Sequence, residues 1–167
     1  MKWAGLFILT VSAFSQASPQ QCFIRAGQDY GIDPLLLTAI SIKESRLKFN
    51  AVNSANSNKT EDVCGMQINS SHYGTLKAFG INRERLLNDP CVCVYTGAWV
   101  LARNFDRYGK NWDSVGMYNT GPSDKLVRQR RAYADHIRRI YYVLKGMQQN
   151  TGKEVTSENT KTAYTLK

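Results

Sequence analysis

The fold of this chain is decided by residues 33–45, which read Asp33-Pro34-Leu35-Leu36-Leu37-Thr38-Ala39-Ile40-Ser41-Ile42-Lys43-Glu44-Ser45. Asp33 followed by Pro34 is an N-cap followed by a first-turn proline, so this pair predicts a helix that begins at residue 34. Apolar residues occupy nearly every face of that helix, which is typical of a helix in the middle of a domain. We therefore expect residues 34–45 to form the central buried helix.

The segments around this helix predict a mainly α fold. Asp89-Pro90 repeats the cap-and-proline signal. The polar loop at 50–60 and the short apolar segment at 63–68, which has the character of a brief strand, leave room for at most a small irregular β region. Helical character is found in five further segments, which are residues 20–30, 70–79, 90–108, 112–118 and 124–147.

The two ends of the chain differ from its middle. Residues 1–17 combine a basic beginning, an apolar run over 4–14 and small residues up to Ala17. This pattern is typical of a cleaved secretory signal peptide, and the run is too short to span a bilayer. Residues 148–167 are polar with almost nothing to bury, so we expect a disordered tail. Residues 18–147 then form one compact domain.

Four cysteines, Cys22, Cys64, Cys91 and Cys93, follow the predicted signal peptide. In an oxidising compartment an even number of thiols predicts disulfides, here two of them. A bridge between Cys91 and Cys93 would close a cramped ring, which leaves two alternative pairings open. A metal site is disfavoured because the chain has no Cys-x-x-Cys pair and only two histidines.

The formal net charge of +9 predicts attraction to polyanions. For an exported protein these are cell-wall polymers, anionic lipid head groups or stray nucleic acid. An acidic wall polymer is the simplest of these partners, although charge alone does not select it.

Glu44 is the main candidate for chemistry. It ends the most hydrophobic helix, where burial and the negative end of the helix dipole both disfavour an ionised carboxylate, so we expect its pKa to be raised. A carboxylic acid that stays protonated near neutral pH can donate a proton to a glycosidic oxygen. The alternative is a surface glutamate paired with Lys48, and Glu44 taken alone favours that alternative.

Further motifs change this balance. In chain order the sequence contains Ile42-Lys43-Glu44-Ser45, Gly65-Met66-Gln67-Ile68-Asn69, Met117-Tyr118-Asn119-Thr120-Gly121 and Tyr133. Together they resemble the four motifs of the soluble lytic transglycosylase family: a Glu-Ser pair, Gly-Leu-Met-Gln, Ala-Tyr-Asn-Ala-Gly and a later tyrosine. The resemblance covers residues 22 to about 145 and implies a lysozyme-like fold. The chain departs from the pattern at Cys64-Gly65 and at Met117 and Thr120, where no polar group needed for chemistry is lost.

Two more strings resemble the small members of this family that accompany secretion, conjugation and type IV pilus machines. They are Cys22-Phe23 and Asp89-Pro90-Cys91. The resemblance implies a disulfide between Cys22 and Cys91, which leaves Cys64 with Cys93. The second bridge would replace the packing of the family's usual leucine. The resemblance also implies a monomeric periplasmic protein that acts on peptidoglycan glycan strands, that serves such a machine, and that binds no nucleic acid.

The resemblance implies that Glu44 is the single catalytic residue. Glu44 would protonate the oxygen between N-acetylmuramic acid and N-acetylglucosamine, with help from the sugar's acetamido group. It would then remove the proton of the muramyl C6 hydroxyl, which closes a 1,6-anhydro ring without water, metal or cofactor. The implied substrate-binding residues are Ser45, Met66, Gln67, Tyr118, Asn119 and Tyr133.

Each of these residues has an expected role. Ser45 would orient the leaving or acetamido side of the sugar, and Gln67 and Asn119 would hydrogen-bond sugar amides. Tyr118 and Tyr133 would flank Glu44 and hold it in place. The methionine of the second motif has two alternatives of equal weight: it lines the subsite, or it packs in the core.

Two other functions remain open. A true hydrolase would use Glu61 or Asp62 to position a water molecule, and goose-type lysozymes share the implied fold. A non-catalytic wall-binding or assembly module would use the basic last helix, although spaced arginines are usually a solvated face. These arginines are Arg128, Arg130, Arg131, Arg138 and Arg139.

Overall fold

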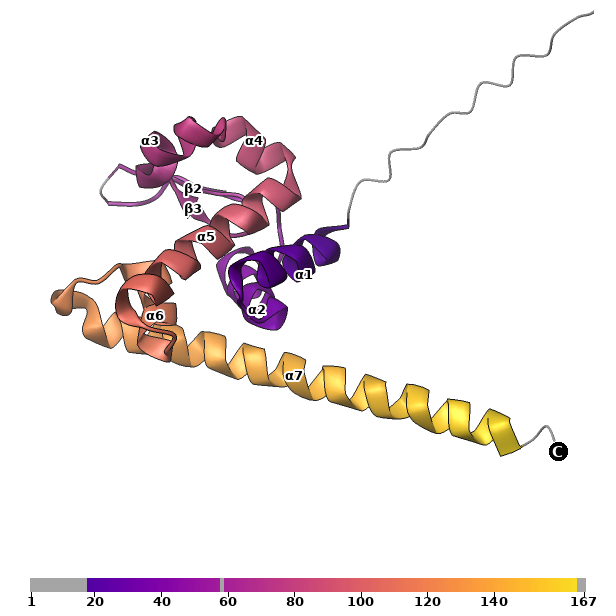
Figure 1. The fold of residues 1–167 in the computed structure, drawn as a ribbon. Coiled ribbons are helices and arrows are strands. Elements are labelled where there is room, and N and C mark those ends of the chain that lie inside the picture. Colours follow the sequence, from indigo (N-terminus) through magenta and orange to yellow (C-terminus); the bar gives the residue numbers. More distant parts are fainter. Residues whose placement is uncertain (1–17, 58, 165–167) are drawn as a thin grey trace, which may run out of the picture.

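The computed structural model describes residues 18–57 and 59–164, with side chains up to residue 151 (Figure 1). The predicted signal peptide lies outside these residues. The helices are α1 (Pro19–Tyr30), α2 (Pro34–Ser45), α3 (Tyr73–Leu76), α4 (Arg83–Asn88), α5 (Pro90–Tyr108), α6 (Trp112–Thr120) and α7 (Val127–Tyr164), and the short 3-10 helices are η1 (Ser70–His72), η2 (Lys77–Phe79) and η3 (Asp124–Leu126). The strands are β1 (Val52–Asn53), β2 (Asp62–Val63) and β3 (Ile68–Asn69).

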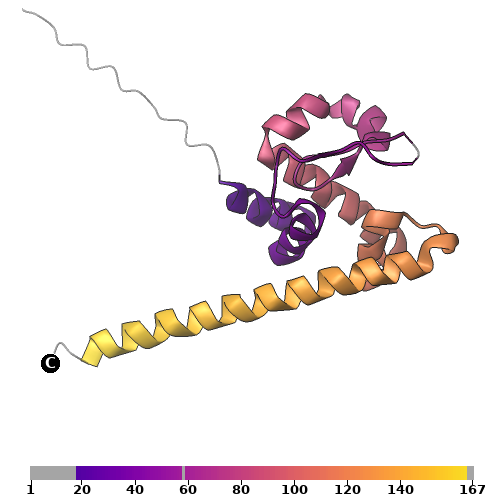
Figure 2. The same cartoon turned by 180° about the vertical axis from the view of Figure 1, so that it is seen from behind.

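Helix α5 separates two groups of elements. On one side are the sheet, α3 and α4, and on the other are α1, α2, α6 and α7 (Figure 1). The views from the front and from behind agree that α7 passes α6 and α2 and continues beyond the rest of the domain (Figure 2). The prediction of a mainly helical domain with a small sheet is confirmed.

Helix α2 has the central position that its composition predicts. The Asp33 side chain accepts a hydrogen bond from the backbone N–H of Leu35 at 2.9 Å, and Pro34 occupies the first turn. Leu37 and Ile40 are fully buried. The helix packs against α1, α5 and α7, so its C-terminal residues are surrounded by other elements on several sides.

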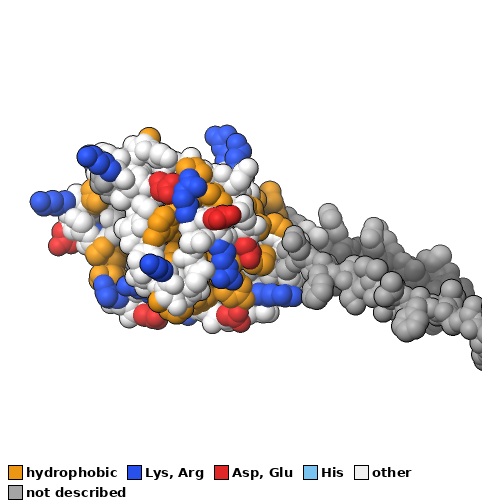
Figure 3. Space-filling model, turned by 90° about the horizontal axis from the view of Figure 1, so that it is seen from above, with side chains coloured by type: hydrophobic (Ala, Val, Ile, Leu, Met, Phe, Trp, Pro, Cys, Tyr) orange, Lys and Arg blue, Asp and Glu red, His pale blue; other side chains and the backbone are white. Residues whose placement is uncertain are grey.

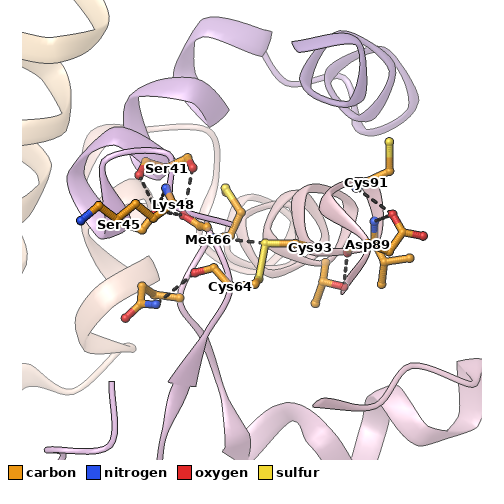
Figure 4. Close-up of a disulfide and its surroundings, with 12 residues drawn as sticks. Ser41, Ser45, Lys48, Cys64, Met66, Asp89, Cys91 and Cys93 are labelled. Atoms are coloured by element: carbon orange, nitrogen blue, oxygen red, sulfur yellow. Dashed lines mark hydrogen bonds between the residues drawn. A yellow bond between two sulfur atoms is a disulfide. The ribbon is translucent and has the colours of Figure 1, made fainter. Parts of the chain in front are cut away.

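The two disulfides join the elements around α5. Cys22 bridges to Cys91 and ties α1 to the start of α5. Cys64 bridges to Cys93 and ties the turn after β2 to the same helix (Figure 4). Both predicted pairings are confirmed. The Asp89 carboxylate caps α5 by accepting from the N–H groups of the two residues after Pro90, which fixes both helix cysteines in the first turn.

The sheet differs from the prediction at residues 63–68. These residues are not one strand, because Val63 and Ile68 pair with each other across an antiparallel turn. Cys64 and Gln67 have φ angles of 64° and 49°, which is left-handed backbone that breaks a strand. The order of the strands is β1-β2-β3, with Val52 opposite Val63.

The predicted helix at 70–79 is broken into the short segments η1, α3 and η2. Gly80, with φ of 66°, ends the last of them. Helix α4 was not predicted, although it has a clear start: the side chain of Asn82 accepts from the N–H of Arg85 at 2.8 Å. The segment is too short for an apolar periodicity to be recognised in the sequence.

Helix α7 is longer than predicted. Residues 148–164 continue the helix that begins at Val127. The disordered tail expected from the composition of residues 148–167 stays a prediction. Among the helices of the described residues, no stretch has the length and apolar character that crossing a membrane requires.

Candidate active site

A groove of about 650 Å³ lies between the two groups of elements. One wall, which we call the sheet wall, comes from the sheet, the loop between β1 and β2, and η1. The other comes from α5 and α6 together with the end of α2, and we call it the helical wall. The sheet wall contributes Asn56, Ser57, Thr60, Asp62, Gln67, Ile68, Asn69, Ser71 and His72, and the helical wall contributes Glu44, Val100, Arg103, Asn104, Arg107, Tyr108 and residues 117–122.

Glu44 lies in this groove in the last turn of α2. Its carboxylate Oε1 accepts a hydrogen bond from the hydroxyl of Tyr133 on α7. Tyr133 is itself only 6% exposed, so this donor is fixed by packing. The alternative of a surface pair with Lys48 is wrong, since no ion pair joins them within the described residues.

Burial raises the pKa of Glu44 above its ordinary value, and the nearby Asp62 adds to the rise. The Tyr133 hydrogen bond and the charge of Lys43 act in the opposite direction without cancelling it. The predicted direction of the shift is confirmed. A carboxyl group in this state retains its proton at a higher pH than an exposed glutamate does.

Tyr118 lines the groove from α6 and donates its hydroxyl hydrogen to the backbone carbonyl of Met66 at 2.8 Å. Burial, followed by the charge of Glu44, raises the pKa of both Tyr118 and Tyr133 well above the usual range. Both phenols therefore stay protonated and remain hydrogen-bond donors near neutral pH. Of the two tyrosines predicted to hold Glu44, Tyr133 bonds to its carboxyl group, whereas the Tyr118 hydroxyl bonds to the Met66 carbonyl.

The structure gives Ser45 a different position from the predicted one. Its hydroxyl donates toward the carbonyl of Gly65 at 2.9 Å and that of Ser41 at 3.3 Å, and it accepts from the N–H of Lys48 (Figure 4). Ser41 donates to the same Gly65 carbonyl at 2.9 Å. Ser45 does not line the groove. Its contacts instead attach the end of α2 to the turn between β2 and β3.

Met66 is fully buried and does not line the groove, so core packing is the correct alternative for its side chain. The reason is a close approach of the turn to α5. A Cβ atom added to Gly97 would lie 2.5 Å from Met66 Cε and 2.9 Å from its Cβ. The backbone N–H of Met66 also donates to Cys93 Sγ at 3.3 Å, so the residue is held on α5 from two directions (Figure 4).

Gln67 and Asn119 do line the groove, on opposite walls. The Gln67 side-chain amide donates to the carbonyl of Cys64 at 3.0 Å, and none of the described residues donates to its Oε1. Asn119 is exposed and forms no side-chain hydrogen bond with the described part of the chain. Both amides thus offer polar atoms to a ligand in the groove.

A cluster around Asp62 was not recognised in the sequence as a unit. Three side-chain amides donate to its carboxylate: Asn69 at 2.7 Å, Asn56 at 2.9 Å and Asn53 at 3.2 Å. The cluster brings a second carboxylate into the groove, on the sheet wall. The only sequence signal is a group of asparagines within twenty residues of Asp62, most of which belong to the predicted polar loop at 50–60.

Glu61, the other acidic residue considered for a hydrolase, does not line the groove. Arg83 donates to it at 2.8 Å and Tyr73 at 3.2 Å. The hydrogen bond from Arg83 is the main cause of its lowered pKa. Of the two residues, only Asp62 remains a candidate for a second carboxylate.

The basic surface proposed for α7 is not continuous. Arg130 is 3% exposed, and its guanidinium reaches Asp113 at 3.2 Å and the carbonyl of Ser123 at 2.7 Å. Arg138 pairs with Asp135 at 2.7 Å. Arg130 is buried because α6 crosses α7 closely, which removes one of the five arginines from any docking face.

The sequence matches the transglycosylase SLT domain over residues 21–141. The chain belongs to this family. The match covers more than half of the chain, and it confirms the family implied by the four motifs.

Relatives of this SLT protein cover most of its length. The X polypeptide of Escherichia coli is 40% identical over an alignment of 152 positions, and the match covers 86% of this chain and 85% of the relative. Invasion protein IagB of Salmonella typhimurium is 40% identical over 126 residues, or 75% of this chain and 78% of the relative. Protein IpgF of Shigella flexneri is 40% identical over 120 residues, or 72% and 78%.

The structure therefore brings four of the six predicted substrate-binding residues to the groove or to Glu44 itself. Tyr118, Gln67 and Asn119 line the groove, and Tyr133 reaches Glu44 from behind it. This arrangement offers a buried acid with one fixed phenol donor, and side-chain amides that still have unused polar atoms, in an SLT domain with its lysozyme-like fold. It is suited to acid–base chemistry on a glycan strand.

Proposed function

We propose that this SLT domain cleaves the bond between N-acetylmuramic acid and N-acetylglucosamine in peptidoglycan and leaves 1,6-anhydromuramyl ends. The observation that carries the proposal is the environment of Glu44. Burial raises its pKa, Tyr133 fixes its carboxyl group, and it faces a groove of glycan-binding size. These are the requirements of a general acid for a glycosidic oxygen.

In the first step Glu44 donates its proton to the glycosidic oxygen, so the bond from the muramyl C1 to that oxygen breaks. The N-acetylglucosamine unit leaves as an alcohol. The electron-poor C1 is stabilised by the carbonyl oxygen of the sugar's own acetamido group. The hydrogen bond from Tyr133 stabilises the carboxylate that forms on Glu44.

In the second step the Glu44 carboxylate takes the proton of the muramyl C6 hydroxyl, and the C6 oxygen bonds to C1. The acetamido oxygen is released and Glu44 is protonated again. No water is consumed, so one carboxyl group serves both steps. Gln67 and Asn119 would hold the sugar amides during both steps, from the two walls of the groove.

Product analysis tests this proposal. Wild-type protein incubated with purified sacculi should release anhydromuropeptides, and Glu44→Gln should lower the rate about a thousandfold or more, since general acid–base catalysis contributes roughly 10²–10⁴. The matched control is Glu61→Gln, because Glu61 lies outside the groove, and it should retain the wild-type rate. Absence of turnover by the wild type would favour the non-catalytic wall-binding module instead.

A hydrolase is the second candidate, because Asp62 places a second carboxylate in the groove. Three asparagine amides fix its carboxylate in the groove, where it can orient a water molecule. Products of a hydrolase would have reducing ends and be one water heavier by mass spectrometry. Asp62→Asn separates the candidates. A lyase should lose only a few-fold in rate, whereas a hydrolase that depends on this carboxylate should lose on the order of a hundredfold.

We also propose that the chain is exported to the periplasm and opens the wall locally for an envelope-spanning secretion, conjugation or pilus machine. The pattern of residues 1–17 and the name of the relative IagB, an invasion protein, support this proposal. Cell fractionation followed by N-terminal sequencing should find the mature chain in the periplasm, beginning at Ser18. A cytoplasmic chain with Met1 retained would contradict it.

A further inference from the structure

Two arginines line the groove on the helical wall and belong to none of the SLT motifs. Arg103 and Arg107 are one turn apart on α5, and both side chains are exposed. Within the described residues neither forms an ion pair or donates a hydrogen bond. Cations in a substrate groove that are not paired with an acidic residue are available to an anionic ligand.

Arg103 is held in place by an aromatic contact. Its guanidinium carbon lies 4.7 Å from the ring centroid of Trp99, and the edge of the His72 ring packs on the same indole at 5.7 Å between centroids. Stacking on a ring face leaves the N–H groups of a guanidinium free at its edge. The contact thus restricts Arg103 without using its hydrogen-bond donors.

The charge at this part of the groove comes from the arginines. Burial and the nearby Arg103 hold the pKa of His72 below its usual value, so its ring is neutral near pH 7. Asp62 lies across the groove and already accepts from three amides. Asp106 follows on α5 but does not line the groove. On the face seen from above, by contrast, basic and acidic side chains are interspersed (Figure 3).

We infer that Arg103 and Arg107 form a carboxylate-binding subsite for the substituent on the muramyl lactyl group. This inference rests on the proposed function, because it takes peptidoglycan as the ligand. The sugar rings of that polymer are uncharged, and its carboxylates are carried on the lactyl side. They belong to the stem peptide, or to the lactyl group itself where the peptide has been removed. Guanidinium groups match such carboxylates in charge and in paired hydrogen-bond geometry.

The subsite makes the two arginines specificity-determining residues rather than catalytic ones. Binding energy from a substituent remote from the reacting bond acts mainly on KM when it is equal in the ground and transition states. We therefore expect Arg103→Gln and Arg107→Gln to raise KM for peptide-bearing strands about three- to tenfold each with kcat unchanged, the range for partly exposed charge pairs. The control is Arg139→Gln, an exposed arginine outside the groove, which should leave both constants unchanged.

Three ligands identify the source of the carboxylate. Equilibrium binding is measured in a Glu44→Gln background with peptide-bearing strands, amidase-treated strands that keep only lactyl carboxylates, and uncharged N-acetylglucosamine oligomers. The arginine changes should weaken binding of the first ligand and leave the third unaffected. Equal weakening of the second assigns the lactyl carboxylate, and no weakening of the second assigns the stem peptide. Added salt should reduce binding of the charged ligands to the wild-type groove more than to the arginine variants.

Failure of the proposed function and failure of the arginine subsite give different results. If the wild type does not turn over sacculi, the proposed chemistry fails, while the binding measurements still test the subsite. If turnover is normal and the double variant Arg103→Gln/Arg107→Gln keeps wild-type KM and affinity, the subsite is wrong. Equal weakening for charged strands and uncharged oligomers also overturns it, because such a result means that the groove has merely been distorted.

Discussion

The two walls of the groove each present one carboxyl group, and they do so by opposite means. On the helical wall, Glu44 is surrounded by packed helices and has one hydroxyl partner, Tyr133. On the sheet wall, Asp62 accepts from three amides, and the strand that carries it is only two residues long. Apolar burial raises the pKa of Glu44, whereas polar contacts hold Asp62 in position.

The difference shows what holds an acidic side chain in position in a small domain. A helix that packs against three others can fix its last turn largely through that packing, to which Ser41, Ser45 and Tyr133 add hydrogen bonds. A short sheet cannot, so the sheet wall needs hydrogen bonds and a covalent attachment to α5 through Cys64 and Cys93. The helical wall should therefore keep its geometry when its disulfide is removed, whereas the sheet wall should not.

The largest effect that should distinguish the two walls comes from Cys64→Ala/Cys93→Ala, which should lower both stability and activity. The bridge spans 29 residues, so its removal should cost roughly 3.5 kcal/mol of unfolding free energy in the chain-entropy model. Because the bridge also anchors the sheet wall, activity should fall even at temperatures where the variant stays folded. Denaturant melts and turnover at low temperature measure the two effects.

The first disulfide provides the control. Cys22 and Cys91 are 69 residues apart, so Cys22→Ala/Cys91→Ala should cost about as much stability or more, roughly 4.4 kcal/mol. This bridge joins α1 to α5 away from the groove lining, and the folded variant should retain its turnover rate. Equal losses of activity in both variants would contradict the distinction between the walls. Unchanged melting and activity without Cys64 and Cys93 would show that this bridge replaces no packing.

A smaller effect is expected from Tyr133→Phe. Loss of the hydroxyl leaves the Glu44 carboxyl without its fixed donor, and kcat should fall about tenfold, near 1.4 kcal/mol. The Tyr133 hydrogen bond lowers the Glu44 pKa, so its removal raises that pKa further. The alkaline limb of the kcat/KM profile should then move to higher pH, because the acid keeps its proton longer.

Tyr141→Phe is the matched control for this change. Tyr141 is on the same helix and donates to Asp33 at 2.8 Å, outside the groove. Its loss should leave the pH profile of activity where it is in the wild type. A shift of the alkaline limb to lower pH in Tyr133→Phe would be inconsistent with the hydrogen-bonded geometry described for Glu44.

The smallest effect concerns stability without catalysis. Because folding raises the pKa of Glu44, its carboxyl group contributes to the stability of the fold at low pH, and this contribution is lost as pH rises through the raised pKa. Glu44→Gln stays neutral, so it should match the wild type near pH 4 and exceed it by about 0.5–1 kcal/mol near pH 8. Denaturant melts across pH give the comparison.

Glu61→Gln should show the opposite pH dependence. Arg83 lowers the pKa of Glu61, so the contribution of this pair is present above the unfolded-state pKa and is lost as pH falls. The variant should be less stable than the wild type near neutral pH and equal to it in acid. A Glu44→Gln protein that is less stable than wild type at pH 8 would mean that burial does not penalise the native carboxylate.

The two walls also differ in how far the sequence predicts them. The helix of residues 34–45 was predictable because its caps and its apolar composition are local, and with the SLT motifs they identified Glu44. The disulfide pairing followed from family strings around Cys22 and Cys91. The Asp62 cluster was not predictable in the same way. Its asparagines come from different strands and a loop. The pairing of β1 with β2 brings Asn53 opposite Asp62, and the turn at Cys64 and Gln67 brings Asn69 there.

Ser45 and Met66 show a further limit of motif reasoning. Both belong to family motifs, yet Ser45 bonds to Gly65 and Met66 is buried against Gly97. A motif identifies residues that the fold needs near the site, and it does not separate those that meet the ligand from those that support the backbone. Only the contacts made by each side chain decide between the two roles.

The close approach of Met66 to Gly97 couples two distant positions in the evolution of the chain. The side chain cannot escape an added methyl group by rotating, because its Cβ and Cγ both lie 2.9 Å from where that group would be. An alanine at position 97 is therefore tolerable only when residue 66 shrinks or the turn moves away from α5. Natural or engineered variants should therefore alter the two residues together.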